Sequence, residues 1–307
     1  MKNSFAYLGP KGTFTETAFL QMPIAKGADL IPAESVREAL NLVRSGEVFG
    51  ALVPIENSVE GSVATTLDEL GHGEALEIID EIAIPVEFAL LAKPGISISD
   101  ITRIATHPHA HAQVMGWLRA NLPGAVVLPA LSTAGAAAAL LEVPRPFDAA
   151  IAQAIAAEIY DLRILADDIG DTKDATTRFV LVSRRGAMPD PTGADKTTLS
   201  LFMHDDHPGA LLAILTEFAV RGVNLTRIES RPTRRALGDY FFSVDLEGHV
   251  ADARVAEAIM GLHRICLDVR YLGSYPRHDG KAPVLRRGVT DADFAEATQW
   301  LGQLKGN

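Results

Sequence analysis

Two hydroxyl groups and a cation stand directly before an apolar run in the middle of the chain. Thr176, Thr177 and Arg178 precede residues 179–182, Phe-Val-Leu-Val, which we expect to form a buried strand. Open α/β sheets bind ligands at strand ends, where side chains from several loops converge. An arginine there indicates an anionic ligand. The alternative is a surface ion pair with two turn-capping threonines, and the residues alone leave both interpretations open.

A second polar segment, residues 56–62, follows another apolar strand. It contains two carboxylates, an amide and two hydroxyls. A carboxyl group can donate a proton if burial raises its pKa, whereas ion pairing or helix capping is the structural alternative. The segment therefore offers Glu56 as a proton donor, with Asn57, Ser58 and Ser62 as neighbouring hydrogen-bonding groups.

Three further loops lead from a predicted strand into a predicted helix. The glycine-rich loop that ends at Thr13 offers backbone amides to an anion, but it lacks the spacing of nucleotide-binding motifs. Thr106 and His107 lie at the end of another strand, where they can hydrogen-bond a substrate. Ser132 and Thr133 begin a helix, and N-capping is their alternative role.

The alternating histidines at His107, His109 and His111 raise the question of a metal site. Three rings at this spacing around a helix start cannot reach one ion without strain. The cluster has neither cysteine partners nor an HExxH pattern. We therefore predict neither a metal nor any other cofactor.

The composition is that of a globular protein with room for two domains. The chain has 307 residues, of which 48% are hydrophobic and 22% charged. A net charge of −11 disfavours nucleic acid and anionic membranes as partners. The single cysteine, Cys266, excludes an intrachain disulfide. With neither a signal-peptide pattern nor a membrane-spanning run, we expect a cytoplasmic protein.

Strands and helices alternate over the first 183 residues, which implies parallel sheets. Ser35 is expected to cap a helix that Gly46 ends, with Glu38 completing a capping box. Extended segments at 76–92 and 176–183 are expected to cross between two lobes, which places Thr177 at an interlobe cleft. The strands are expected at 5–8, 49–55, 101–105, 126–129 and 149–152, and the helices at 14–21, 36–45, 110–122, 133–141 and 155–162.

A separate compact unit follows residues 184–193, which are rich in turn formers. Its elements occur in the order β-α-β-β-α-β, the ferredoxin-like arrangement. Thr290 is a possible N-cap for a last helix, over 291–304. The unit's strands are expected at 197–203, 225–232, 240–246 and 269–274, and its helices at 208–221 and 251–263.

These motifs, in this order, resemble those of the prephenate dehydratase family over residues 5–275. The catalytic part of the resemblance rests on Gly9-Pro10-Lys11-Gly12-Thr13-Phe14, Pro54-Ile55-Glu56-Asn57-Ser58-Val59-Glu60-Gly61-Ser62-Val63, Thr106-His107-Pro108, Ser132-Thr133-Ala134 and Thr177-Arg178-Phe179. The C-terminal unit resembles the regulatory ACT domain of the family at Gly209-Ala210-Leu211 and at Asn224-Leu225-Thr226-Arg227-Ile228-Glu229-Ser230-Arg231-Pro232.

The resemblance implies an α/β fold with a bilobal catalytic domain like type 2 periplasmic binding proteins, followed by an ACT domain. It implies conversion of prephenate to phenylpyruvate in L-phenylalanine biosynthesis, without a cofactor. Phenylalanine is the implied allosteric effector, tyrosine is left open as a second, and a homodimer or homotetramer is expected. Arogenate dehydratase and a non-enzymatic small-molecule sensor are the alternatives. The implied catalytic domain is 1–187, with one lobe at about 1–80 and 176–187 and the other at about 81–175. The implied linker is 188–196, the ACT domain 197–276, and a tail with a short helix 277–307.

The family motifs also imply roles for individual residues. The implied catalytic residues are Thr177, Arg178, Glu56, Asn57 and Ser58. Substrate contacts are implied for Thr13, Ser62, Thr106, His107, Ser132, Thr133, Thr176 and Phe179. Effector contacts are implied for Gly209, Ala210, Leu211, Asn224, Leu225, Glu229, Ser230, Arg231 and Pro232.

We expect Arg178 to anchor a substrate carboxylate and Thr177 to hydrogen-bond the departing hydroxyl. An alcohol is a poor acid at pH 7, so the proton is expected to come from Glu56 or from water. Two positions depart from the family pattern. Ala175 stands where asparagine is common, with Asp174 or Thr176 as possible substitutes, and His109 stands where glutamine is frequent.

Overall fold

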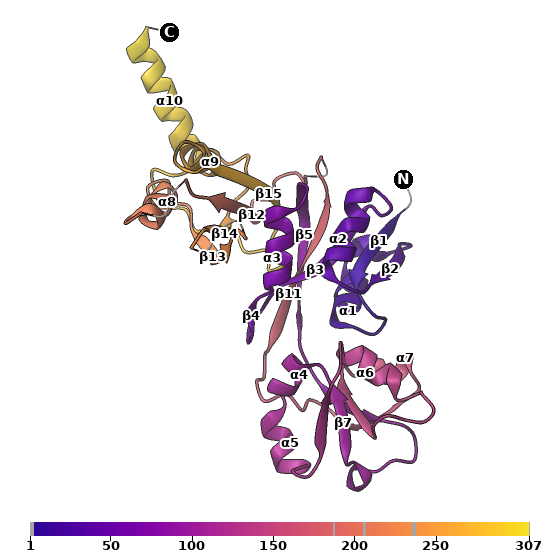
Figure 1. The fold of residues 1–307 in the computed structure, drawn as a ribbon. Coiled ribbons are helices and arrows are strands. Elements are labelled where there is room, and N and C mark those ends of the chain that lie inside the picture. Colours follow the sequence, from indigo (N-terminus) through magenta and orange to yellow (C-terminus); the bar gives the residue numbers. More distant parts are fainter. Residues whose placement is uncertain (1–2, 187, 205–206, 235–237, 307) are drawn as a thin grey trace. The chain divides into compact units, whose positions relative to one another are not determined.

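The protein consists of two compact units (Figure 1). The computed structural model describes residues 3–186, 188–204, 207–234 and 238–306. Met1–Val63 and Ile82–Phe179 form unit 1, and Ala64–Glu81 and Val180–Asn307 form unit 2. Residues 64–81 therefore group with the C-terminal part of the chain, whereas the predicted catalytic lobe included them. The predicted domain end at residue 187 lies outside the described residues.

The first lobe of unit 1 is built on a sheet with the strand order β2-β1-β3-β11-β5. Strand β1 is parallel to both of its neighbours, and the short β4 pairs antiparallel with β3. Strands β11 and β5 each continue along the chain into unit 2. The elements are β1 (Ser4–Leu8), α1 (Phe14–Gln21), β2 (Asp29–Ala33), α2 (Val36–Ser45), β3 (Gly50–Asn57), β4 (Gly61–Ser62), β5 (Leu76–Pro85) and β11 (Thr176–Arg184), with a short 3-10 turn at Pro23–Ala25.

Local sequence determines where the first helices begin and end. The Ser35 hydroxyl accepts a hydrogen bond from the Glu38 amide at 3.2 Å, and Gly46 ends α2 with a φ of 80°. Both predictions are confirmed. The capping box is only half formed, because the Glu38 carboxylate accepts from the Glu34 amide instead of the Ser35 amide.

The second lobe of unit 1 contains a mixed sheet with the order β10-β6-β9-β7-β8. Strand β7 is parallel to β8 and β9, as predicted, but β6 is antiparallel to β9 and β10, so the prediction of parallel sheets is wrong for β6. The elements are β6 (Ala89–Ala92), a 3-10 turn (Ile98–Asp100), β7 (Arg103–Thr106), α4 (Pro108–Ala112), α5 (Met115–Asn121), β8 (Val126–Pro129), α6 (Thr133–Ala139), β9 (Ala149–Ala152), α7 (Ile155–Ile159) and β10 (Arg163–Ala166).

The helix predicted over 110–122 is interrupted, so α4 and α5 are separate helices. The Asp171 carboxylate accepts hydrogen bonds from the amides of Gly116 and Trp117, at 2.7 and 3.0 Å. An anion at these free amides stabilises a new helix start. The break is thus fixed by a residue far along the chain, which local periodicity does not reveal.

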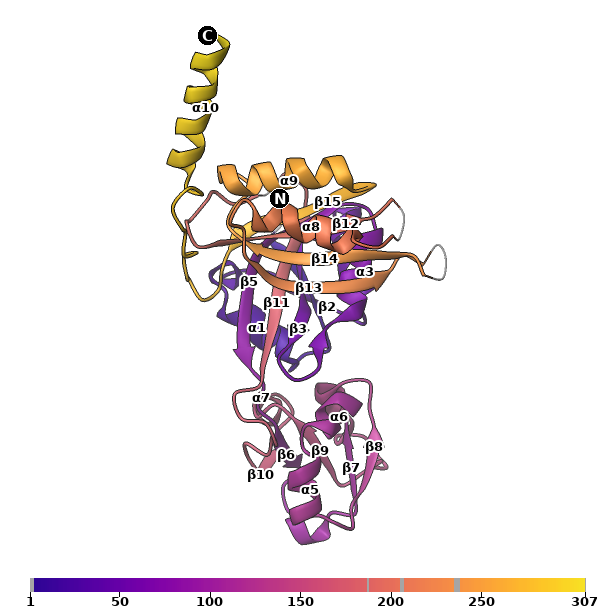
Figure 2. The same cartoon turned by 90° about the vertical axis from the view of Figure 1, so that its left-hand side faces the viewer.

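Unit 2 contains a four-stranded antiparallel sheet with the order β13-β14-β12-β15. Helices α8 and α9 cover one face of it (Figure 2), over a core that includes Leu199, Phe218 and Leu262. The ferredoxin-like prediction is confirmed. The elements are β12 (Asp195–Phe202), α8 (Ala210–Ala219), β13 (Leu225–Pro232), β14 (Tyr240–Glu247), α9 (Ala253–Ile265), β15 (Asp268–Pro276) and α10 (Asp291–Lys305).

Unit 2 also includes α3 (Ala64–His72), which the sequence analysis did not predict. Three features weaken its local signal: β-branched Thr65 and Thr66 at the start, and Gly71 near the end. None of the described helices is both long and apolar enough to cross a membrane.

Candidate active site

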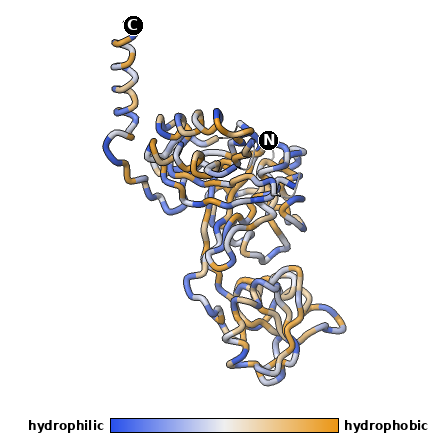
Figure 3. Tube along the Cα trace, turned by 60° about the vertical axis from the view of Figure 1, so that its left-hand side comes forward, coloured by the Kyte–Doolittle hydropathy of each residue, from blue (hydrophilic) through white to orange (hydrophobic). Residues whose placement is uncertain are grey.

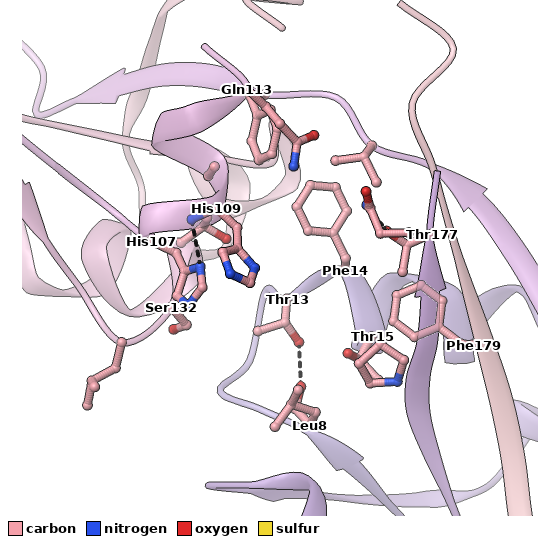
Figure 4. A pocket seen from close by; sticks show the side chains of 17 residues that line it. Leu8, Thr13, Phe14, Thr15, His107, His109, Gln113, Ser132, Thr177 and Phe179 are labelled. Carbon is pink, nitrogen blue, oxygen red and sulfur yellow. Dashed lines mark hydrogen bonds between the residues drawn. The ribbon is translucent and has the colours of Figure 1, made fainter. Parts of the chain in front are cut away.

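Unit 1 contains a cavity of about 240 Å³ whose walls come from both lobes (Figure 4). One part of its lining is apolar and largely aromatic: Leu8, Phe14, Pro54, Val86, Phe88, Ala110, Leu131 and Phe179. The other part carries hydroxyl, amide and imidazole groups: Thr13, Thr15, Asn57, His107, His109, Gln113, Ser132, Thr133 and Thr177. A mixed apolar and polar lining of this kind is typical of small-molecule sites.

The start of β11 contributes alternate residues to the cavity, and Pro54 and Asn57 of β3 also line it. Thr177 and Phe179 line it, but Arg178 does not. Successive side chains of a strand point to opposite faces, so neighbouring residues cannot all face one cavity. The Arg178 Nε instead lies 3.5 Å from a carboxylate oxygen of Glu56, and the Thr176 amide donates to the Ser58 hydroxyl at 2.9 Å.

The central polar contact is a hydrogen bond between Asn57 and Thr177. The Asn57 Nδ2 donates to the Thr177 Oγ1 at 2.8 Å. The orientation of the amide is fixed, because its Oδ1 accepts from the backbone amides of Val59 and Glu60 at 2.8 and 2.9 Å. Since the Thr177 oxygen accepts from Asn57, its own hydrogen points elsewhere. Thr177 is therefore positioned to donate a hydrogen bond.

Gln113 has an unusual environment that was not predicted from the sequence. Its side chain is 7% exposed and lines the cavity, and its amide points toward Phe14 in Figure 4. The Oε1 atom is buried and has no hydrogen-bond partner among the described residues. A buried acceptor without a partner is costly, so it indicates a missing ligand group. The spacing from His109 to Gln113, four residues across α4, is a signal that could have found it.

The imidazoles of His107 and His109 lie against each other, with ring centres 4.9 Å apart. The His107 Nδ1 accepts from the His109 amide at 3.3 Å. Burial lowers the pKa of His107 and the neighbouring His109 lowers it further, against an opposing effect of Glu60. His107 is thus a neutral ring at pH 7, with its Nε2 hydrogen available to a ligand.

Two helix starts also border the cavity. The Thr13 hydroxyl accepts from the Glu16 amide at the start of α1, and the Ser132 hydroxyl accepts from the Gly135 amide at the start of α6. Both hydroxyls thus cap helices, which the sequence analysis gave as the alternative role for Ser132. Both hydroxyls still line the cavity. The Thr13 hydroxyl also donates to the Leu8 carbonyl at 3.0 Å, so Ser132 is the one of the two whose hydroxyl hydrogen is available to a ligand.

Of the glycine-rich loop, Thr13 lines the cavity but residues 9–12 do not. The Gly12 amide donates to the buried Glu16 carboxylate at 2.6 Å, so the protein's own anion occupies the place predicted for a ligand. Gly12 has a φ of 85°, and an added Cβ would lie 3.3 Å from Ile159. Ala175, where the family often has asparagine, is buried in the apolar cluster that includes Val86.

The structure brings together seven of the thirteen residues predicted for catalysis or substrate binding. Thr13, Asn57, His107, Ser132, Thr133, Thr177 and Phe179 line the cavity, whereas Glu56, Ser58, Ser62, Thr106, Thr176 and Arg178 do not. Thr106 is fully buried, and its hydroxyl donates to the Ile151 carbonyl at 2.8 Å. Within the described chain, no lysine or arginine lines this cavity. Neutral groups such as hydroxyls and amides must therefore make most of the polar contacts to a ligand.

The predicted effector residues lie in unit 2, in two separate places. Gly209, Ala210 and Leu211 line a cavity at the start of α8 with Met203 and Phe242. The residues Asn224, Leu225, Glu229, Ser230, Arg231 and Pro232 do not line that cavity; they lie just before or on β13, which is an edge strand.

Arg231 is engaged with α3. Its guanidinium donates to both carboxylate oxygens of Asp68, at 3.0 and 3.1 Å, and Arg234 donates to the same carboxylate at 2.7 Å. Burial raises the pKa of Asp68, but the hydrogen bonds and charges of the two arginines outweigh it, and the net pKa is lowered.

Further contacts join α3 and β5 to the four-stranded sheet. The His72 ring makes a 2.9 Å hydrogen bond with the Thr233 carbonyl. At Gly71 an added Cβ would lie 2.7 Å from the Phe241 ring. The Lys196 ammonium donates to both oxygens of the fully buried Glu81 carboxylate, at 2.9 and 3.1 Å.

Comparison with known proteins identifies the family. The family model described as prephenate dehydratase matches residues 5–187, and the ACT domain model matches residues 197–264. Prephenate dehydratases from Amycolatopsis methanolica and Mycolicibacterium vanbaalenii are 45% and 48% identical to the chain, each over 98% of the chain and 97% of the relative.

A solved structure, that of prephenate dehydratase from Arthrobacter aurescens in complex with L-Phe, has 52% sequence identity and a TM-score of 0.94. The match covers 99% of this chain and all of that one. These matches agree with the order of the motifs, with the two-lobed cavity and with the ferredoxin-like sheet. All of them indicate the same family. The chain belongs to the prephenate dehydratase family.

Proposed function

We propose that this chain is a cytoplasmic prephenate dehydratase, a carbon–oxygen lyase that converts prephenate to phenylpyruvate in L-phenylalanine biosynthesis. One observation carries the assignment beyond the family match. The Asn57–Thr177 hydrogen bond presents a hydroxyl donor inside a cavity with aromatic walls. This combination suits a cyclic substrate that must lose a hydroxyl group.

The lining matches the chemistry of prephenate. The substrate is a cyclohexadiene with two carboxylates and a hydroxyl, and it becomes aromatic when carbon dioxide and water leave. Phe14, Phe88 and Phe179 offer apolar contact to the ring. The hydroxyls of Thr13, Ser132 and Thr133 and the His107 ring lie in the same cavity. We assign Ser132, Thr133 and His107 to the carboxylates and the keto oxygen, because the Thr13 hydroxyl already donates to the Leu8 carbonyl at 3.0 Å.

Thr177 stabilises the departing hydroxyl. As carbon dioxide leaves, its electron pair enters the ring and the hydroxyl departs from the opposite carbon. Donation from Asn57 to the Thr177 oxygen polarises the Thr177 O–H bond, which strengthens the hydrogen bond to the leaving oxygen. Negative charge grows on that oxygen during the step. The interaction is therefore stronger in the transition state than in the ground state.

Water, rather than Glu56, is our proposed final proton source. The Glu56 carboxylate faces Arg178 and does not line the cavity. We assign Glu56, Ser58, Thr176 and Arg178 to holding the ends of β3 and β11 together, so that Asn57 and Thr177 stay in register. This proposal replaces direct contact between Arg178 and a substrate carboxylate. Ser62 and Thr106 are likewise assigned positioning roles.

We propose that residues 1–187 form the catalytic domain, 188–196 a linker, 197–276 the ACT domain and 277–307 a tail.

For regulation, we propose that L-phenylalanine binds at the Gly209–Leu211 loop, with the β13 residues of a second subunit completing the site. The L-Phe complex of the Arthrobacter protein supports this effector, and the open cavity at the loop supports its place. The site then requires a homodimer or homotetramer.

We further propose that the Asp68–Arg231 ion pair links the effector site to catalysis. Arg231 lies on β13, among the predicted effector residues. Asp68 lies on α3, and α3 follows the segment that holds Asn57 directly along the chain. A shift of β13 on effector binding would move α3 through this pair and so alter the position of Asn57.

The assignment is tested by adding prephenate to the purified protein and following phenylpyruvate by its absorbance, with arogenate as a competing substrate. We expect phenylpyruvate and carbon dioxide in equal amounts, and a lower rate when phenylalanine is added. Absence of phenylpyruvate from a folded protein would refute the enzyme assignment. Preference for arogenate would change the substrate but keep the site.

Replacing Gln113 with leucine should separate stability from activity. The substitution removes a buried acceptor without a partner, so the free energy of unfolding should rise by about 1 kcal/mol. The substrate loses a hydrogen bond, so kcat/KM should fall about tenfold or more, which corresponds to at least about 1.4 kcal/mol. Urea unfolding and steady-state kinetics measure the two quantities.

Gln153→Leu is the matched control. Gln153 is similarly buried, at 8% exposed, but its Oε1 accepts a hydrogen bond from Thr17 at 3.0 Å. Its loss should lower the free energy of unfolding. If Gln113→Leu is as destabilising as Gln153→Leu and has normal kinetics, Gln113 has no role in binding.

A further inference from the structure

Helix α10 carries an apolar face that the described part of the chain leaves exposed beyond the half-buried Phe294. No residue of α10 is buried, and Trp300, Leu301 and Leu304 are 61%, 44% and 66% exposed. In Figure 3 its trace carries both apolar and polar segments, and in Figure 1 it extends away from the rest of unit 2. A lone helix of 15 residues is only marginally stable in water, so an apolar face on it indicates a partner.

The start of α10 is firmly attached to unit 2. Val289 is 5% exposed and lies against Gly222. The Arg286 guanidinium donates a hydrogen bond to the Ala219 carbonyl. The Asp291 carboxylate accepts one from the Ala253 amide at 2.8 Å. Thr290 and Asp293 form a complete capping box, as the N-cap prediction anticipated in part. The direction in which the helix leaves unit 2 is therefore defined at its base.

The apolar residues follow the spacing of a coiled coil. Phe294, Ala297, Leu301 and Leu304 are separated by three, four and three residues, which is the a-d-a-d pattern of two heptads. Such a seam is narrower than the apolar face of a helix that packs on a globular core. The spacing therefore favours a second helix as the occupant.

The charges on α10 favour an antiparallel copy of itself. Asp291 and Asp293 lie in the first turn and Lys305 in the last. In an antiparallel pair with Phe294 opposite Leu304 and Ala297 opposite Leu301, Asp291 and the Lys305 of the second copy are both e positions. They lie about 3 Å apart along the axis, so opposite charges meet at each end. The helix dipoles are then also opposed, which is favourable. A parallel pair would place the acidic turns side by side.

We propose that α10 is a self-association element that pairs antiparallel with α10 of a second copy of this chain about a two-fold axis level with residue 299, next to Thr298. Such a contact is isologous, so it closes a dimer, and it is separate from the sheet edge at β13. It does not depend on the enzymatic assignment. Its seam contains few large side chains, so it adds to another interface between subunits instead of replacing one.

Thiol cross-linking of the full-length protein tests the pairing. The only native cysteine, Cys266, is buried, so the background is low. Thr298→Cys places two thiols beside the two-fold axis, and a short bifunctional thiol reagent should convert most of the protein to a covalent dimer. Gln299→Cys, at the outward-facing f position, is the matched control and should stay monomeric on a denaturing gel.

Lys305→Cys determines the direction of the helices. In the antiparallel pair its equivalent in the second copy is about 18 Å away along the axis, beyond the reach of a short reagent. Cross-linking at Lys305→Cys would show a parallel pair and overturn the proposal. If Thr298→Cys also fails to cross-link while circular dichroism shows a folded protein, α10 does not pair with a second copy at all. Either failure leaves the prephenate assay unaffected.

Discussion

Replacing Thr177 with valine should lower kcat for phenylpyruvate formation about 10²- to 10³-fold, the usual effect of losing one donor that stabilises developing negative charge. Valine keeps the branched shape but removes the hydroxyl that Asn57 orients. The Michaelis constant should change much less, because the lost interaction is made mainly in the transition state. Steady-state kinetics with prephenate give both constants.

Ser183→Ala is the control for this variant. Ser183 is also a buried hydroxyl on β11, at 1% exposed, but its Oγ donates to the Arg184 carbonyl and does not line the cavity. Its kcat should stay near that of the unmodified chain. Thr177→Ser should retain most of the activity because it keeps the donor. A folded Thr177→Val variant with near-normal kcat would show that another group assists departure of the hydroxyl.

Replacing Asp68 with asparagine should remove most of the response to phenylalanine. Allosteric coupling commonly amounts to about 1–3 kcal/mol, or roughly 5- to 150-fold in affinity. Asparagine cannot form the two-point ion pair with Arg231, and Arg234 loses the same partner. Phenylalanine should still bind, because the substitution leaves the Gly209–Leu211 loop and the β13 residues of the proposed site, Arg231 included, chemically unchanged. Inhibition curves and calorimetry measure coupling and binding separately.

Loss of stability must be distinguished from loss of coupling. The Asp68 side chain is 6% exposed but its partners are more exposed, so breaking the contact should cost about 1–3 kcal/mol of folding free energy. Val255→Ala in the core of the same unit should cost a comparable amount without touching α3. If Val255→Ala also abolishes inhibition, or Asp68→Asn keeps it, the ion pair is not the link.

Local chemistry made much of this fold predictable. Helix caps at Ser35, Gly46 and Thr290 were identified because capping depends on residues within one turn. The β-α-β-β-α-β order was likewise visible, since each of the six elements from β12 to β15 has a period of its own. Motifs at the ends of strands indicated the cavity because strand ends in a two-lobed fold converge.

The remaining features depend on contacts that are distant in sequence. The break between α4 and α5 requires Asp171, and α3 is held by Arg231, far along the chain. A motif also does not show which of its residues face the ligand. Thr177 and Arg178 are adjacent in sequence but point to opposite faces of β11, so only Thr177 lines the cavity.

If Asn57 and Thr177 act as one unit, a double-mutant cycle should show it directly. Asn57→Asp keeps the acceptor for the Val59 and Glu60 amides but removes the donor to Thr177. We predict that kcat/KM for prephenate falls in each single variant, and that the double variant with Thr177→Val is about as slow as Thr177→Val alone. Losses that multiply in the double variant would show that the two residues act independently and would contradict the account.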